Sequence, residues 1–207
     1  MITLHHLNQS RSKRIIWLLE ELGVEYKIQP YCRDKVTFLA PPELKSVHPL
    51  GKSPVLEDNG MIITESGAIT EYLIDTYGNG KFKPERGTHA YIDYIQWLHF
   101  AESSAILPLL LKMFVTKDGA KMNFLGDYAD METQKVMQYF DQRLAGKTYL
   151  VEERLTGADF MMSFIAEILN TYGILTDYPN IKRYFEQLST HQGYLAAQAL
   201  EQKYNGE

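Results

Sequence analysis

The chain has 207 residues, of which 45% are hydrophobic, and its formal net charge is −5 at pH 7. This length is enough for one large domain or two small ones with a packed core. The negative charge and the lack of a run of Lys or Arg argue against nucleic acid as a partner.

Three further features of the sequence bear on the cellular location of the protein. The apolar run at residues 106–111 is too short to cross a bilayer and contains Pro108, which argues against a membrane protein. The first residues show no charged region leading into an apolar one, so we expect no signal peptide. The single cysteine, Cys32, rules out an intramolecular disulfide, and a cytoplasmic protein is the simpler interpretation.

The first part of the chain, to about residue 78, predicts a mixed α/β domain. Residues 2–7 predict a strand, and residues 14–22 carry a helical apolar face that ends at Gly23. A second strand is expected between Glu25 and Pro30, and the prolines at 41–42 favour a short helix start.

A hairpin follows. Pro54 opens a short apolar strand, where a residue without an N–H is tolerated. The run Asp58-Asn59-Gly60 predicts a tight turn into a second strand at 61–63. A helix is expected from about Ser66 to 77, so the order is β-α-β-α-β-β-α, with helices on a four-stranded sheet.

The second part is predicted to be all-helical, because strand signals disappear after a loop at 78–84. A capping box is expected at Thr156 and Asp159, and a bend near Pro108. The expected domains are 1–80 and 86–207. The expected helices cover about 85–115, 130–144, 158–172, 181–188 and 193–202.

Five motifs in this order make the chain resemble a cytosolic glutathione transferase, with a thioredoxin-like α/β domain followed by a helical one. The stretch at 40–54 is similar to the branch shared by fungal and bacterial transferases. The motifs are NQSRS at 8–12, LGKSPVL at 50–56, TESGAI at 64–69, LTGADF at 155–160 and YPNI at 178–181.

The resemblance implies a glutathione site in the first domain. Pro54 would follow a cis peptide bond, and the backbone of Ser53 would pair with the cysteinyl part of glutathione. Glu65 would bind the ammonium group of the γ-glutamyl end, and the helix start at Ser66 its carboxylate. Lys52 is expected at the glycyl carboxylate. Gln9 is assigned to glutathione binding by the same resemblance. Taken alone, Glu65 and Ser66 would be ordinary capping residues and Lys52 a solvated turn residue.

The residue that stabilises the glutathione thiolate is sought in the loop before the first helix. The thiolate is the nucleophile, and a hydroxyl donor beside the sulfur favours it. Ser10 is the first candidate by its position, and Ser12 is the second. Ser12 also fits a helix N-cap, capping is equally open for Ser10, and Asn8 could donate through its amide. Backbone amides are a further source of this stabilisation.

An aromatic helix supplies candidates for the second substrate. Tyr94, Trp97, Phe100 and Ser104 are expected to line a pocket for an apolar electrophile, although aromatics at helical spacing also suit a core or a dimer interface. No metal site is expected, because the six histidines show no H-x-x-x-H spacing. Cys32, without a C-x-x-C motif, is interpreted as a lone half-buried thiol, which argues against dithiol redox chemistry.

These features favour a cytoplasmic transferase that uses glutathione as co-substrate and conjugates it to electrophilic, largely apolar small molecules. A homodimer and a role in detoxification are implied by the resemblance. The alternatives are a glutathione-dependent peroxidase or disulfide reductase and, in another class, a non-catalytic glutathione-binding interaction module.

Overall fold

The structure is a computed structural model that describes residues 1–119 and 124–204. It divides into two compact units. Unit 1 consists of Met1–Phe82 with Leu188–Glu207, and unit 2 of Lys83–Gln187. The domain limits expected from the sequence, 1–80 and 86–207, stay a prediction. By its contacts, the last helix belongs to unit 1, which the sequence did not suggest.

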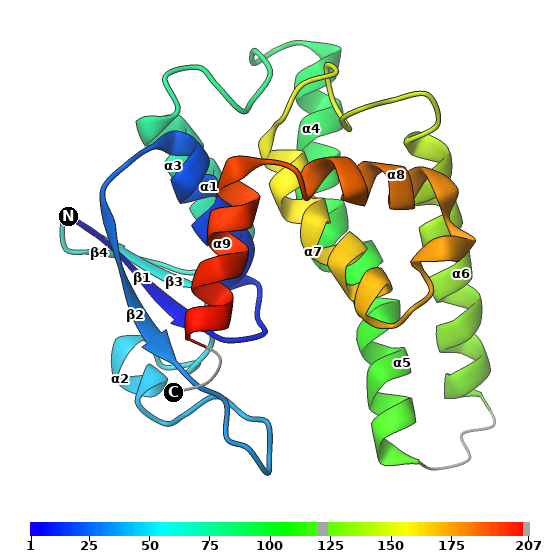
Figure 1. Cartoon of the computed structure of the whole chain (residues 1–207), viewed down its shortest axis with the longest axis horizontal. Helices are drawn as coiled ribbons and strands as arrows, with labels where there is room; N and C mark the ends of the chain where they lie inside the picture. The colour runs from blue at the N-terminus through cyan, green and yellow to red at the C-terminus, as the bar shows by residue number, and fades with distance from the viewer. Residues whose placement is uncertain (120–123, 205–207) are drawn as a thin grey trace. The chain divides into compact units, whose positions relative to one another are not determined.

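The sheet of unit 1 has the predicted topology (Figure 1). Its strand order is β2-β1-β3-β4, with β1 parallel to β2 and antiparallel to β3. Pro30 lies within β2 opposite His6, which is possible because an edge strand tolerates a missing N–H. The strands are β1 (Ile2–Leu7), β2 (Tyr26–Tyr31), β3 (Val55–Asp58) and β4 (Met61–Ile63).

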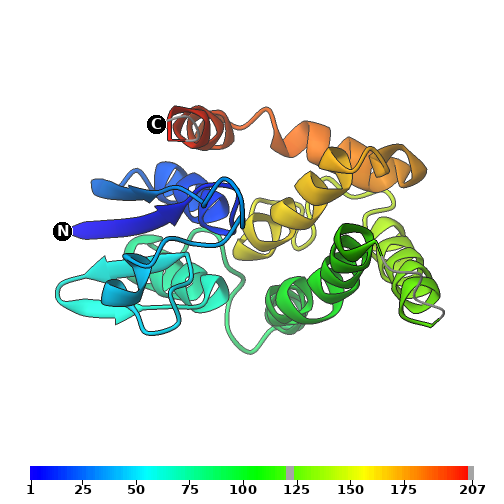
Figure 2. The same ribbon diagram turned by 90° about the horizontal axis from the view of Figure 1, so that it is seen from below.

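In its described residues, unit 1 also contains four helices. The helix α9 lies beside α1 (Figures 1 and 2), where the Tyr194 ring meets Trp17 edge to face at 5.3 Å between centroids. Gly193 permits this close approach, since a Cβ there would lie 3.0 Å from a Trp17 ring carbon. The helices are α1 (Ser12–Leu22), α2 (Leu44–Val47), α3 (Ser66–Tyr77) and α9 (Gln192–Lys203).

Unit 2 is helical in its described part, as expected. Its α4 packs against α7, and α5 against α6 (Figure 2). The elements are α4 (His89–Phe100), η1 (Ala101–Ala105), α5 (Ile106–Asp118), α6 (Leu125–Arg143), α7 (Gly157–Thr171), η2 (Leu175–Asp177) and α8 (Pro179–Leu188), the last of which ends at the unit boundary.

The bend expected near Pro108 takes the form of a wider, π-helical turn, η1, just before it. Pro108 lacks an N–H, and its ring crowds the carbonyl four residues earlier, so the irregularity falls on the preceding turn. By length and composition alone the continuous helical stretch His89–Asp118 could cross a membrane, and within unit 2 its α4 part packs on α7 and its α5 part on α6.

The capping box of α7 is confirmed. Thr156 and Asp159 exchange side-chain and backbone hydrogen bonds, with the Thr156 N–H donating to Asp159 Oδ2 over 2.8 Å. Asp159 is fully buried and also accepts from the Leu150 N–H and the Tyr184 hydroxyl. This one carboxylate therefore joins α7, α8 and the loop before α7.

Candidate active site

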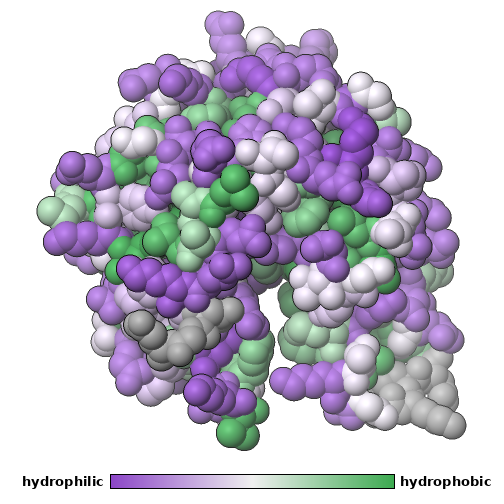
Figure 3. Space-filling view, viewed as in Figure 1, coloured by the Kyte–Doolittle hydropathy of each residue, from purple (hydrophilic) through white to green (hydrophobic). Residues whose placement is uncertain are grey.

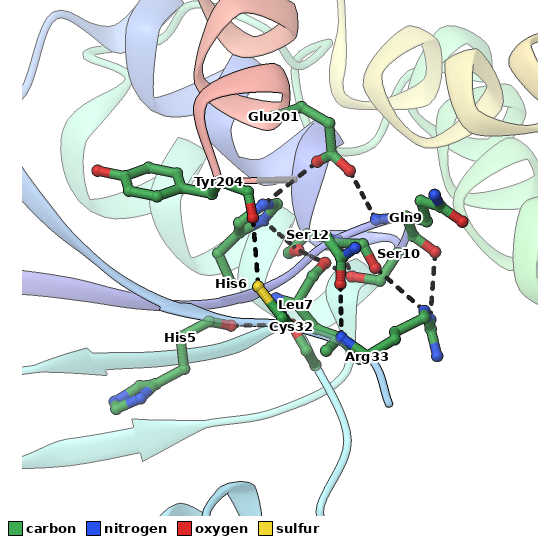
Figure 4. A network of polar contacts seen from close by, with 12 residues as sticks. His5, His6, Leu7, Gln9, Ser10, Ser12, Cys32, Arg33, Glu201 and Tyr204 are labelled. Carbon is green, nitrogen blue, oxygen red and sulfur yellow. Dashed lines mark hydrogen bonds and ion pairs between the residues drawn. The ribbon is translucent and has the colours of Figure 1, made fainter. Parts of the chain in front are cut away.

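The loop between β1 and α1 holds both candidate serines (Figure 4). Ser10 is 8% exposed and Ser12 is fully buried. Their Oγ atoms lie 2.8 Å apart, and the Ser12 N–H donates to Ser10 Oγ over 3.2 Å. The N-cap of α1 is Arg11, not Ser12, and Ser12 is the first helical residue. The expected N-cap role of Ser12 is therefore not seen, and Ser10 Oγ is the acceptor for the start of the helix.

A buried histidine lies beneath these serines. His6 Nδ1 is 2.7 Å from Ser12 Oγ, and His6 Nε2 is 3.2 Å from a carboxylate oxygen of Glu201 in α9. Burial lowers the pKa of His6 to about 4, so the ring is neutral at pH 7. The other oxygen of Glu201 accepts from the backbone N–H of Gln9 over 2.6 Å.

The opposite side of the loop is held by Arg33, which follows β2. Its guanidinium donates to the carbonyls of Asn8 and Gln9, each over 3.1 Å. The Arg33 N–H also donates to Asn8 Oδ1 over 2.9 Å, so this side-chain oxygen is used inside the protein. Gln9 itself is exposed and has a φ of 52°, an uncommon value outside glycine.

The Ser53–Pro54 peptide bond is cis, as the resemblance implied. Ser53 Oγ donates to the His5 carbonyl over 2.8 Å and accepts from the Leu7 N–H over 3.1 Å. The segment is thus attached to the end of β1, immediately before the loop that carries Ser10.

The start of α3 is the position where the resemblance implied an anion site, which stays a prediction. Glu65 is exposed and has φ 63° and ψ 115°, a conformation that costs a non-glycine residue on the order of 1–3 kcal/mol. The Ser66 hydroxyl is buried and accepts a hydrogen bond from Arg14 of α1. Lys52 is exposed in the turn before Ser53. Hydrogen bonds thus join β1 to the cis-proline segment, and α1 to the start of α3.

The candidates for the electrophile pocket divide into two groups. Tyr94 and Trp97 are 2% and 3% exposed, and Trp97 packs against Phe100 and Phe140 at 5.2 and 5.7 Å between ring centroids. These contacts give Trp97 a core role. Phe100 is half-buried and Ser104 is exposed. The pocket itself stays a prediction.

Other reactive groups add little to this site. Cys32 is exposed rather than half-buried, and its thiol donates to the carbonyl of Tyr204 over 3.4 Å. Within the described ranges 1–119 and 124–204, no cluster of three or more His, Cys, Asp or Glu has the arrangement of a metal site.

The family models for the N-terminal and C-terminal domains of glutathione S-transferase match residues 1–75 and 104–192. Glutathione S-transferase 3 of Schizosaccharomyces pombe is 37% identical over 205 residues, covering 91% of this chain and 83% of the relative.

The chain belongs to the glutathione S-transferase family.

Two solved structures extend the comparison. A glutathione S-transferase from Actinobacillus pleuropneumoniae has a TM-score of 0.89 at 40% identity, covering 98% of this chain and 93% of that one. A glutathione transferase homologue from Lodderomyces elongisporus, with two glutathione molecules per subunit, has a TM-score of 0.83 at 23% identity and shares the fold. It covers 96% of this chain and 98% of that one. The fungal and bacterial relatives confirm the predicted branch.

Sequence reasoning missed four residues of the candidate site in this transferase. Arg14 donates to Ser66 at the start of α3. The other three contact residues of the segment from Asn8 to Ser12, and they are His6, Arg33 and Glu201. Of these, Glu201 had one weak signal. The buried residues of α9 include Tyr194, Ala197 and Glu201, whose spacing places a carboxylate on an otherwise apolar helix face.

Proposed function

We propose that this transferase binds glutathione on unit 1, between the loop at Ser10, the cis-proline segment and the start of α3. The observation that carries the proposal is the set of hydrogen bonds joining these segments, through Ser53 to β1 and through Arg14 to Ser66. In this arrangement Glu65 takes the ammonium group and the free N–H groups of α3 take the carboxylate of the γ-glutamyl end.

The Ser10 hydroxyl is the proposed donor to the thiolate. A free thiol has a pKa near ~8.5, and a donated hydrogen bond favours the anion. The thiol releases its proton to solvent, the sulfur attacks an electrophilic carbon, and a carbon–sulfur bond forms as the leaving group departs. The protein contributes position and electrostatic stabilisation.

The second substrate is proposed to be a largely apolar electrophile. The aromatic character of α4 supports this class, with Phe100 and Ser104 as its accessible candidates. The only cysteine, Cys32, lies outside the loop and its thiol donates a hydrogen bond to the Tyr204 carbonyl, which argues against dithiol redox chemistry. Reduction of peroxides or disulfides by bound glutathione needs no protein cysteine and stays the alternative to conjugation.

A homodimer in the cytoplasm with a detoxifying role is part of the proposal. Apolar side chains exposed in the loop after β2 support self-association: Val36 is 91%, Leu39 66% and Phe38 46% exposed. In Figure 3 hydrophobic residues lie at the tip of this loop, and also in several other areas of a mainly hydrophilic face. Light scattering at micromolar concentration tests the dimer, and a monomer would refute it.

Calorimetric titration with glutathione tests binding. We expect a dissociation constant between micromolar and millimolar, or roughly 4–8 kcal/mol. Glu65→Ala should weaken binding by at least about tenfold, because it leaves the ammonium group without its charged partner. Glu71→Ala, an exposed carboxylate on the same helix, is the matched control and should bind as the wild type does. Equal affinity of both variants would contradict the proposed site.

An activity panel then distinguishes the reactions. Chloroarene, peroxide and mixed-disulfide substrates are compared at saturating glutathione. Conjugation of the chloroarene is expected. Turnover of only the peroxide or disulfide would make reduction the function, and binding without turnover of any of them would favour a non-catalytic module.

A further inference from the structure

The hydroxyls of Ser10, in the loop before α1, and of Ser12, the first residue of α1, lie side by side, but their surroundings differ. Ser12 Oγ is buried with two acceptors in reach, His6 Nδ1 at 2.7 Å and the Leu7 carbonyl at 3.2 Å. A hydroxyl has a single proton to donate. The proton of Ser12 is therefore used inside the protein, and Ser10 is the donor in the 2.8 Å hydrogen bond between the two hydroxyls. The proton of Ser10 can turn from Ser12 Oγ toward a ligand.

Glu201 determines which nitrogen of His6 carries hydrogen. Its Oε2 lies 3.2 Å from His6 Nε2, and an ionised carboxylate only accepts hydrogen bonds. A neutral imidazole has one N–H, and this contact selects Nε2 for it. His6 Nδ1 is then the acceptor for Ser12 Oγ, and the polar contacts run in one direction, from Ser12 to His6 and on to the carboxylate of Glu201.

The same carboxylate fixes the backbone next to Ser10. Figure 4 shows Glu201 extending from α9 toward both His6 and Gln9. The Gln9 N–H donates to Glu201 Oε1 over 2.6 Å, and Gln9 holds a left-handed conformation with φ 52°. The position of the Ser10 backbone and the direction of the hydroxyl protons thus both depend on one residue far along the chain.

We propose that Glu201 and His6 are positioning residues that, through Ser12, make Ser10 the hydroxyl that donates to the glutathione thiolate. The inference rests on the proposed function, because it requires a thiolate beside Ser10. Neither Glu201 nor His6 touches the substrate in this proposal.

The test measures the pKa of the bound glutathione thiol from its thiolate absorbance. Ser10→Ala should raise that pKa by about one unit, or about tenfold less thiolate at a given pH, because a hydrogen bond to an anion is lost. Glu201→Ala should raise it similarly, and the double variant no further than Ser10→Ala alone. Affinity for S-methylglutathione, which has no thiol, should stay within about twofold in Ser10→Ala.

Two variants serve as controls. Glu25→Ala removes an exposed carboxylate of the same unit and should leave the thiol pKa unchanged. Glu201→Gln keeps an oxygen for the Gln9 N–H but no longer selects the His6 tautomer, so it should bind S-methylglutathione normally and still raise the thiol pKa. A wild-type pKa in Glu201→Gln would overturn the role of the carboxylate charge.

The outcomes separate the two proposals. If Ser10→Ala raises the thiol pKa but Glu201→Ala does not, or if their effects add in the double variant, the positioning inference is wrong and the proposed function stands. If Ser10→Ala has no effect while glutathione binds, the assignment of Ser10 fails. If glutathione does not bind the wild type, the proposed function fails as a whole.

Discussion

At the scale of single residues, His6 shows how burial sets a charge state. The side chain is fully buried beneath the Ser10 loop, and the loss of hydration disfavours its charged form. Its pKa of about 4 lies below the value of 6.5 for an exposed histidine. Between these values the unfolded chain binds a proton that the folded chain does not.

This difference predicts a loss of stability in acid. The contribution of His6 is complete above pH ~6.5 and is lost as the pH falls toward about 4, because protons then favour the unfolded state. Between pH 7 and pH 5 the free energy of unfolding of the wild type should fall by about 2 kcal/mol more than that of His6→Asn.

Urea titrations at the two pH values make this measurement. His99→Asn, at an exposed position in α4, should keep the wild-type pH dependence. An identical pH dependence in His6→Asn would mean that the buried ring is not the group that titrates.

At the scale of elements, hydrogen bonds at the helix ends stabilise the helices. Thr156 is the N-cap of α7. The side chain of Asp159, the third helical residue, accepts a hydrogen bond from the Thr156 N–H. Free N–H groups in the first turn need such acceptors, more so where no water reaches them. The cap of α7 is fully buried, so its loss has no replacement from solvent.

Thr156→Ala should destabilise unit 2 by about 1–2 kcal/mol, the usual value of an N-cap. Thr171→Ala, at the exposed end of the same helix, should change the free energy of unfolding of unit 2 by less than about 0.5 kcal/mol. Urea unfolding followed by Trp97 fluorescence in the Trp17→Phe background measures both effects. Equal effects of the two substitutions would contradict the role of the buried cap.

At the scale of the whole molecule, each unit contains one of the two tryptophans. Trp17 lies in unit 1 against Tyr194 of α9, and Trp97 lies in the aromatic core of unit 2. The stability of the two units can therefore be followed separately in variants that keep a single tryptophan.

A chain ending at Gln187 should lose stability mainly in unit 1. Without α9, Trp17 loses its contact with Tyr194, and buried apolar surface worth at least about 2 kcal/mol is exposed. In the Trp97→Phe background the midpoint reported by Trp17 should fall. In the Trp17→Phe background the midpoint reported by Trp97 should stay. Equal shifts at both probes would contradict the division into units.

Local sequence patterns predicted most helices and strands. The features that were not predicted depend on contacts between residues far apart in the sequence. The strand at Ile2–Leu7, the helix at Ser66–Tyr77 and the α7 capping box follow from spacing over a few residues, so the sequence was enough. The π-helical turn was expected only as a bend, because the residue that disturbs the helix lies beyond the turn that deforms.

The site was predictable to a different degree. The cis-proline segment and the start of α3 were found by resemblance, since their residues lie close together in sequence. Glu201 was not predicted, because its contact with Gln9 spans 192 positions and nothing in the sequence of α9 indicates which residue it contacts. Arg33 was missed for a related reason, since its bonds to backbone carbonyls leave no trace in side-chain patterns.

The attachment of α9 to unit 1 also imposes an order on synthesis. A ribosome makes the chain from the N-terminus, and domains generally fold as they emerge. Unit 1 cannot be completed in this way, because α9 is made only after all of unit 2. A nascent chain would thus carry a folded helical unit before its Ser10 loop acquires the contact with Glu201, which forms only after α9 has been synthesised.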